Sequence, residues 1–186
     1  DHYPNYHPNT PAGKQFVSIG GQYLWQNTGV QYESGKTYTL TVSLAKYADL
    51  PALGGVIQLD YSNTSTGASD AMVVDESFYN ADLSSVQWTD KSVSILPGDA
   101  AIGKYIVVKL VRWGSWVGFD NVRLTVETST SLIVNPSFEW PDVPTGTLTH
   151  DVPTGWNYAG GTGYMELVDH YPNYHPNTPA GKQFVS

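Results

Sequence analysis

An exact internal repeat is the feature that most constrains this chain. Residues Asp1 to Ser18 read DHYPNYHPNTPAGKQFVS, and Asp169 to Ser186 repeat them letter for letter at an offset of 168 residues. Solenoid repeats have periods of roughly 20–50 residues, whereas this offset has the size of a whole domain. We interpret the chain as a window on a tandem array of identical domains. A circular permutation with overlapping ends, or a duplicated segment, is the alternative.

The short polar stretch Thr125 to Ser131 is the most linker-like part of the sequence. It predicts that residues 1–130 form the C-terminal major part of one repeat and that residues 131–186 form the N-terminal part of the next. A single domain has room for one copy of the duplicated segment. We expect the N-terminal copy to complete the fold locally, because chain continuity makes that closure cheapest in entropy. We expect residues Ser131 to Val168 to pack forward on the following unit.

The composition is typical of a secreted β protein. The chain has 13 Tyr and 6 Trp, only 14% charged residues and no cysteine. Without disulfides, an extracellular or cell-surface domain commonly relies on a bound metal for stability. The net charge of −8 makes nucleic acid an unsuitable partner, and no apolar run is long enough for a membrane span.

Alternating apolar and polar residues predict half-buried antiparallel strands. The runs with this pattern or with strand-like composition are Tyr38–Leu44, Val56–Tyr61, Val86–Ile95, Lys104–Val111 and Val117–Val126. Only Ala45 to Leu53 has weak helical character. Several short strands separated by turns predict an all-β, antiparallel jelly-roll β-sandwich, here cut out of register from its repeat.

Five motifs in the rotated order resemble a known family. They are Val134-Asn-Pro-Ser-Phe-Glu139, Gly155-Trp156, Gly13-Lys-Gln-Phe-Val17, Gly35-Lys-Thr-Tyr-Thr-Leu40 and Gly118-Phe-Asp-Asn-Val-Arg-Leu124. Together they resemble the galactose-binding-like jelly rolls of bacterial carbohydrate-binding modules. The resemblance implies a calcium ion between Glu139 and Asp120, with Asn135 as a weaker candidate ligand. Carboxylate oxygens suit this hard cation; the alternative is that both acids only cap strands.

Aromatic residues are the candidates for carbohydrate or interface contact. Trp113 and Trp116 flank a tight loop, and Trp116 is the one more suited to point into the core. Trp88 is suited to packing, and Trp25, Trp140 and Trp156 are expected in the core. The proline-rich segment around Tyr3, Tyr6 and His7 forms a stiff loop that suits contact with a neighbouring repeat or subunit.

The sequence is compatible with three functions. The leading hypothesis is a calcium-stabilised structural repeat of an extracellular filament, adhesin stalk or matrix, linked to identical neighbouring repeats or subunits through strands, without enzymatic activity. The alternative is a carbohydrate-binding module that uses exposed Trp and Tyr residues to hold a polysaccharide. The second alternative is a cyclase-like enzyme, because cyanobacterial indole-alkaloid cyclases resemble this scaffold and carry an acid at the position of Asp120.

Overall fold

A computed structural model describes most of the chain. The described residues are 10–13, 15–20, 22–47, 52–114, 116–127, 132–134, 137–139, 141–142, 148–159 and 165–169. Tyr3, Tyr6, His7, Asn135 and Trp140 lie outside them.

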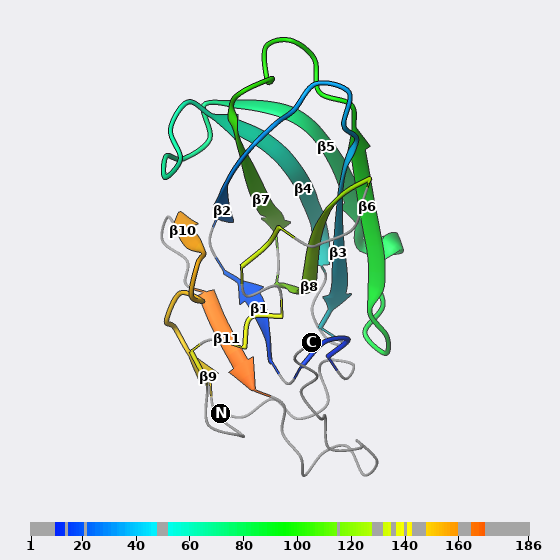
Figure 1. Cartoon of the computed structure of the whole chain (residues 1–186). Coiled ribbons are helices and arrows are strands. Elements are labelled where there is room, and N and C mark those ends of the chain that lie inside the picture. Colours follow the sequence, from blue (N-terminus) through cyan, green and yellow to red (C-terminus); the bar gives the residue numbers. More distant parts are fainter. Residues whose placement is uncertain are drawn as a thin grey trace.

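Two antiparallel sheets pack face to face (Figure 1). The six-stranded sheet has the order β6-β3-β8-β1-β11-β9, with β6 (Thr89–Ile95), β3 (Tyr38–Lys46), β8 (Val117–Val126), β1 (Gln15–Ile19), β11 (Met165–Asp169) and β9 (Leu148–Thr149). The five-stranded sheet has the order β10-β2-β7-β4-β5, with β10 (Asn157–Ala159), β2 (Tyr23–Gln31), β7 (Tyr105–Gly114), β4 (Ala52–Ser62) and β5 (Ala71–Tyr79). This architecture confirms the predicted all-β jelly-roll sandwich.

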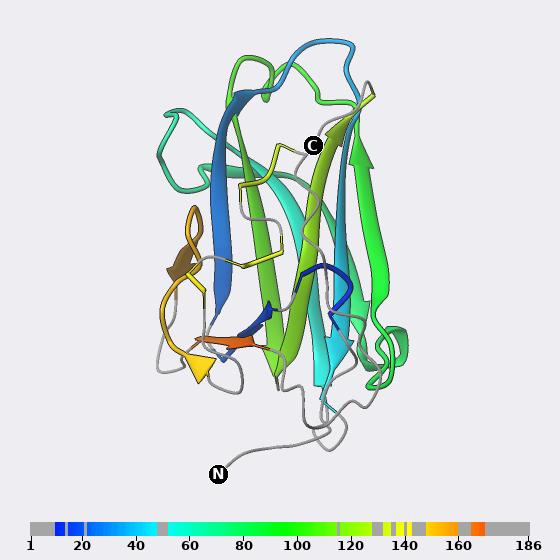
Figure 2. The same ribbon diagram turned by 60° about the horizontal axis from the view of Figure 1, so that its bottom comes forward.

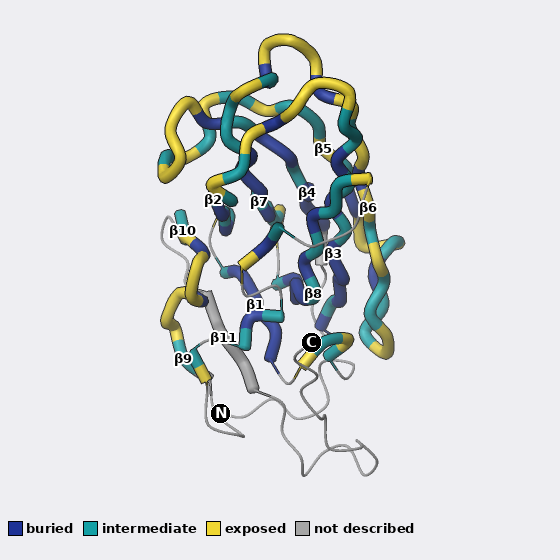
Figure 3. The backbone as a smooth tube through the Cα atoms, viewed as in Figure 1, coloured by how far each residue is buried: buried dark blue, intermediate teal, exposed yellow. Residues whose placement is uncertain are grey.

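The core forms where the inward-facing residues of the two sheets meet. Successive side chains of a strand point to opposite faces, so Leu40 and Val42 of β3 belong to the same core as Ile57 and Leu59 of β4. Figure 3 shows the buried residues following the strands while the connecting loops stay exposed. Phe78 of β5 and Phe119 of β8 contact one another across the two sheets, with ring centroids 6.1 Å apart.

Two local expectations are wrong. Ala45 and Lys46 end strand β3 and residues 52–53 begin β4, and the only helical element among the described residues is the short 3-10 helix η1 (Asn80–Asp82). Sheet pairing, such as Ala45 opposite Gly118, overrides the weak helical character there. Trp25 lies on the outer face of the five-stranded sheet, because its neighbours Leu24 and Gln26 are the inward-facing, buried residues of β2.

The expected forward packing is also wrong for the described residues beyond 131. Ile133, Phe138 and Trp156 belong to the same core as the residues of β2 and β3. The Leu132 amide donates a hydrogen bond to the Leu124 carbonyl at 2.9 Å. The chain buries these apolar groups in its own sandwich, since tethering makes that contact cheaper than one with a separate unit.

Strands from the two ends of the sequence therefore lie side by side (Figure 2). β11 pairs with β1 along five residue pairs, and β10 pairs with β2. The N-terminal copy of the duplicated segment supplies β1, as expected. No helix in the described part of the chain has the length and apolar character required to cross a membrane.

Candidate functional site

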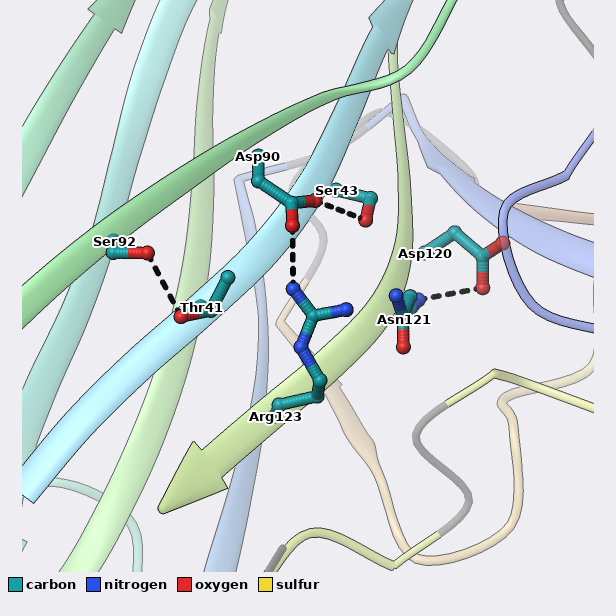
Figure 4. Close-up of polar contacts among 7 residues, drawn as sticks. All are labelled: Thr41, Ser43, Asp90, Ser92, Asp120, Asn121 and Arg123. Atoms are coloured by element: carbon teal, nitrogen blue, oxygen red, sulfur yellow. Dashed lines mark hydrogen bonds and ion pairs between the residues drawn. The ribbon is translucent and has the colours of Figure 1, made fainter. Parts of the chain in front are cut away.

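Asp120 lies on β8 next to a backbone irregularity. The following residue, Asn121, has a positive φ of 49°, a conformation that Asn tolerates better than most residues. One Asp120 carboxyl oxygen accepts the Asn121 amide at 2.6 Å, and the other accepts the Ala12 amide at 3.3 Å. Figure 4 shows this carboxyl pointing away from the Asp90–Arg123 pair.

Glu139 reaches the same region from the other end of the sequence. Its Oε1 accepts the Gln15 amide at 2.7 Å. Gly13 lies so close that a Cβ there would be 2.3 Å from Glu139 Oε1. The preceding Phe138 has a φ of 57° and is fully buried against Trp156, with ring centroids 5.1 Å apart. A bulky residue in this backbone conformation is strained and persists only where packing over-determines it, as it does beside Glu139.

Burial raises the pKa of Asp120 well above its ordinary value, and the nearby charge of Glu139 raises this pKa further. The Asn121 and Ala12 amides lower it, because they donate to the ionised carboxylate. Asp120 is 0% exposed. Two such acids held together are costly when both are ionised, and a bound cation is one way to remove that cost.

The surrounding donors fit a hard cation. Gln15, whose amide holds Glu139, has a buried side-chain Oε1 without a hydrogen-bond partner. Calcium takes carboxylate and amide oxygens of this type. The described residues contain no group of three or more acidic, His or Cys side chains, so carbonyl groups or water would complete the shell. The sequence-based ligands Glu139 and Asp120 thus approach one another, while Asn135 lies outside the described residues.

A second candidate site covers the outer face of the five-stranded sheet. Strand alternation and pairing place its outward residues in rows across the strands. We call this surface the aromatic face and define it by Tyr79, Ser77, Asp75 and Met72 of β5, Gly54, Val56, Gln58 and Asp60 of β4, Trp113, Val111, Lys109 and Val107 of β7, and Tyr23, Trp25 and Asn27 of β2.

One row of the aromatic face places two exposed rings on either side of a glycine. Tyr79 and Trp113 both lie opposite Gly54, on its two flanking strands. Their side chains are 56% and 42% exposed, and their ring centroids lie 6.2 Å apart at an interplanar angle of 53°. Gly54 has no side chain to separate the rings. This row is an aromatic notch suited to the apolar face of a flat ligand.

Polar groups lie two and three rows away from the notch. The Lys109 ammonium sits 4.4 Å from the Tyr23 ring centroid and 3.9 Å from the Asp60 carboxylate. Asp60 is 1% exposed, and burial raises its pKa, while a hydrogen bond with Ser69 and the charge of Lys109 lower it. Its Oδ1 has no hydrogen-bond partner. The face thus combines stacking rings with amide, ammonium and carboxyl groups, which is how ligand sites obtain orientation and specificity.

Trp116 and Trp88, two other tryptophans considered in the sequence analysis, contact neighbouring side chains. Trp116 is half-buried, 6.4 Å from the Tyr47 ring and 6.0 Å from the Arg112 guanidinium. Trp88 packs edge-on against Phe16, with centroids 5.5 Å apart. Trp88 agrees with the expectation of packing. Trp116 lies outside the apolar core cluster, and Trp113 is exposed.

Sequence reasoning missed Tyr79, Gly54, Lys109 and Asp60. The available signal was the Gly54-Gly55 pair inside a strand, since glycine in a strand interior marks close approach of another group. Which rings flank it depends on the pairing of three strands, and no local pattern specifies that pairing.

Comparison with solved structures supports the fold. A carbohydrate-binding module titled "PbXyn10C CBM APO" matches with a TM-score of 0.54 and 18% sequence identity, covering 86% of this chain and 90% of that chain. At this identity the likeness establishes the fold alone, an antiparallel two-sheet β-sandwich. No curated protein sequence matches the chain significantly.

A sequence profile described as "HpiC1-like: HpiC1 cyclase" matches residues 1–125. This match overturns the expectation that the chain is not an enzyme, because the family is named after a cyclase. Local spacing in the sequence reveals no catalytic arrangement, because strand pairing brings together residues that are far apart in the chain. Since the profile covers more than half of the sequence, the chain belongs to the HpiC1-like family.

Proposed function

We propose that the aromatic face binds a carbohydrate chain. The exposed Tyr79–Trp113 notch over Gly54 carries the proposal. Sugar rings stack their apolar faces on such side chains, while Gln58, Lys109 and Asp75 offer hydrogen bonds to hydroxyl groups. The similarity in fold to a carbohydrate-binding module supports this function better than the structural-repeat hypothesis.

Removal of a notch ring tests the proposal. Trp113→Ala and Tyr79→Ala should each weaken binding to a polysaccharide by about 1–3 kcal/mol, because stacking and apolar burial are lost. The measurement is calorimetric titration against soluble xylans and glucans, after a first screen by affinity electrophoresis.

Leu96→Ala is the matched control. Leu96 is a large exposed apolar residue that directly follows β6, at the far edge of the other sheet. Its variant should bind like the unchanged protein. The proposal fails if no polysaccharide binds, or if Trp113→Ala binds as tightly as Leu96→Ala.

Calcium binding by Asp120 and Glu139 is part of the proposal. Its support is the approach of two carboxyl groups, the buried Asp120 and the unpartnered Gln15 Oε1. An ion there would join β8 to the segments around residues 12 and 139. Its role would be to stabilise the sandwich, away from the aromatic face.

A cyclase-type reaction on the aromatic face is a second candidate, favoured by the family match and by one acid. Asp120 is the acid that the resemblance to cyclases implies, yet both of its oxygens already accept backbone amides. Asp60 is as buried as Asp120, at 1% exposed, but its Oδ1 has no hydrogen-bond partner, and its raised pKa keeps its carboxyl protonated to higher pH than usual. A general acid needs that property.

Asp60→Asn tests this candidate. It should abolish product formation from indole-bearing cyclisation substrates, since an amide cannot donate the acidic proton. In the unchanged protein the rate should fall as the pH rises through the pKa of Asp60. Product analysis by mass spectrometry across acidic and neutral pH measures both effects, and a rate that survives Asp60→Asn excludes this assignment.

A further inference from the structure

The loop between β4 and β5 covers one end of the aromatic face. We call this loop, residues 63–70, the strap. The side-chain amide of Asn27, on the outer face of β2, donates hydrogen bonds to the strap carbonyls of Thr64 and Gly67, both at 2.9 Å. Since β7 lies between β4 and β2, the strap crosses over β7 to reach Asn27. In Figure 1 this loop projects from the ends of β4 and β5 on the side of the sheet where β2 lies.

The strap accounts for the burial at that end of the face. Asp60 and Val107 lie opposite one another and point outward, because their neighbours along the two strands face the core. Yet Asp60 is 1% exposed and Val107 is 0% exposed, and Asp60 forms a hydrogen bond with Ser69 of the strap. The aromatic face is therefore closed at the row of Asp60, whereas the notch at its other end is exposed.

Aromatic side chains follow the face toward the strap. Trp113 of β7 lies in the row of the notch, and Tyr23 and Trp25 of β2 lie one and two rows further along. Asn27 comes next on the same face of β2, and it is the residue that holds the strap. The stacking surface thus runs along the strands, and a glycan chain that follows it from the notch meets the strap.

The row before the strap carries polar groups. The Lys109 ammonium lies 4.4 Å from the Tyr23 ring centroid and 3.9 Å from the Asp60 carboxylate, which fix its place. Gln58 lies beside Lys109 in this row and opposite Asp75 of β5. Such groups hydrogen-bond with hydroxyls, and the end of a glycan chain has a free hydroxyl where the next sugar would be attached. Because two acids offset the charge of Lys109, this row favours a neutral sugar.

We propose that the strap makes the aromatic face a site for the end of a neutral glycan chain, with the row of Lys109 as the terminal subsite. An interior segment that follows the aromatic side chains would have to continue through the space that the strap fills. This inference rests on the proposed carbohydrate-binding function and adds to it which part of the chain is bound.

Partial hydrolysis of one polysaccharide tests the inference, because hydrolysis multiplies the chain ends while the mass of sugar stays constant. The probe is the soluble xylan or glucan that binds most tightly in the first screen. Calorimetric titration measures the binding sites per gram, and a reducing-sugar assay measures the number of ends. The sites per gram should rise by the same factor as the number of ends, as long as the fragments still reach from the notch to Lys109.

A number of sites that stays constant while the ends multiply overturns the inference. The proposed function survives that result if Trp113→Ala still weakens binding. Absence of binding to every polysaccharide removes the proposed function itself, and the inference with it.

A variant without the strap gives a second measurement. Residues 63–69 are replaced with Asn-Gly, the sequence favoured in two-residue hairpin turns. This variant should uncover Asp60 and Val107 and bind interior segments, so its sites per gram should no longer follow the number of ends. Asn27→Ala keeps the whole loop but removes two of its hydrogen bonds, and it should change binding in the same direction by a smaller factor.

Thr39→Ala is the matched control. It removes a side-chain hydrogen bond with Ser94, 2.7 Å long, on the outer face of the other sheet, and it should keep the dependence on chain ends. Near-ultraviolet circular dichroism checks that each variant is folded. Should the variant without the strap fail to fold, Asn27→Ala and the hydrolysis series still decide. Dependence on ends that is unchanged in a folded variant without the strap contradicts the inference.

Discussion

At the scale of single residues, Asp120 and Glu139 are distant in the sequence, but the fold brings them close enough for the charge of one to affect the other. The buried Asp120 accepts two amides, Glu139 accepts a third, and the two carboxyl groups repel one another when both are ionised. Backbone donors reduce this cost without removing it, which is why the pKa of Asp120 stays raised. A divalent cation would favour both ionised forms at once.

Calcium should therefore stabilise the folded chain. Addition of a chelator should lower the unfolding temperature, because an ion that binds only the native state stabilises it by mass action. Glu139→Gln and Asp120→Asn should each abolish this response. Thermal unfolding followed by circular dichroism, with and without calcium, measures it.

The control for calcium is Asp90→Asn. Asp90 accepts hydrogen bonds from Ser43 and Arg123 on the exposed side of the same sheet (Figure 4), so its variant should keep the full calcium response. A melting curve that chelation leaves unchanged in the unsubstituted protein would rule out the metal assignment.

At the scale of elements, β4 shows what sequence patterns can and cannot predict. The alternation of Val56 to Tyr61 correctly indicated a half-buried strand, because each residue's face follows from its own place in the strand. The approach of Tyr79 and Trp113 was not predictable, because it depends on β4 lying between β5 and β7. The same limit applies to the paired acids, where resemblance to a family provided Glu139 and Asp120 but local spacing did not.

Gly54 adopts a backbone conformation that allows β5 to lie close to β4, with Tyr79 and Trp113 on either side of it. Its φ is 138°, and a Cβ there would lie 2.2 Å from the Phe78 carbonyl oxygen on β5. Gly54→Ala should cost about 1–3 kcal/mol of stability through strain and the displacement of β5. It should also weaken polysaccharide binding by moving Tyr79 relative to Trp113. Urea unfolding and calorimetric titration measure the two effects.

Gly98→Ala is the control for Gly54→Ala. A Cβ at Gly98 would meet no atom within 4 Å, so the change in stability should stay within about 0.5 kcal/mol. Equal stability of the two variants would contradict the account of the notch.

At the scale of the whole molecule, one core is assembled from both ends of the described chain. Gln26 of β2 donates to the carbonyl oxygens of Val134 and Gly155 and accepts the Val134 amide. Ile133, Phe138 and Trp156 then complete the same apolar cluster. The described parts of residues 1–130 and 131–186 therefore belong to one sandwich, in which strands from the end of the chain pair with strands from its beginning. The tandem array, the identical neighbouring repeats, the filament and the cell-surface location stay predictions.

The register of β1 with β11 has a mechanical consequence. Gln15 lies opposite Asp169, so the chain enters β1 and leaves β11 at the same end of the pair. Tension applied on the two sides of this pair peels the strands apart and loads their hydrogen bonds one after another, instead of shearing all of them together. Under such a load, β1 would separate from β11 at low force, before β3 separates from β8.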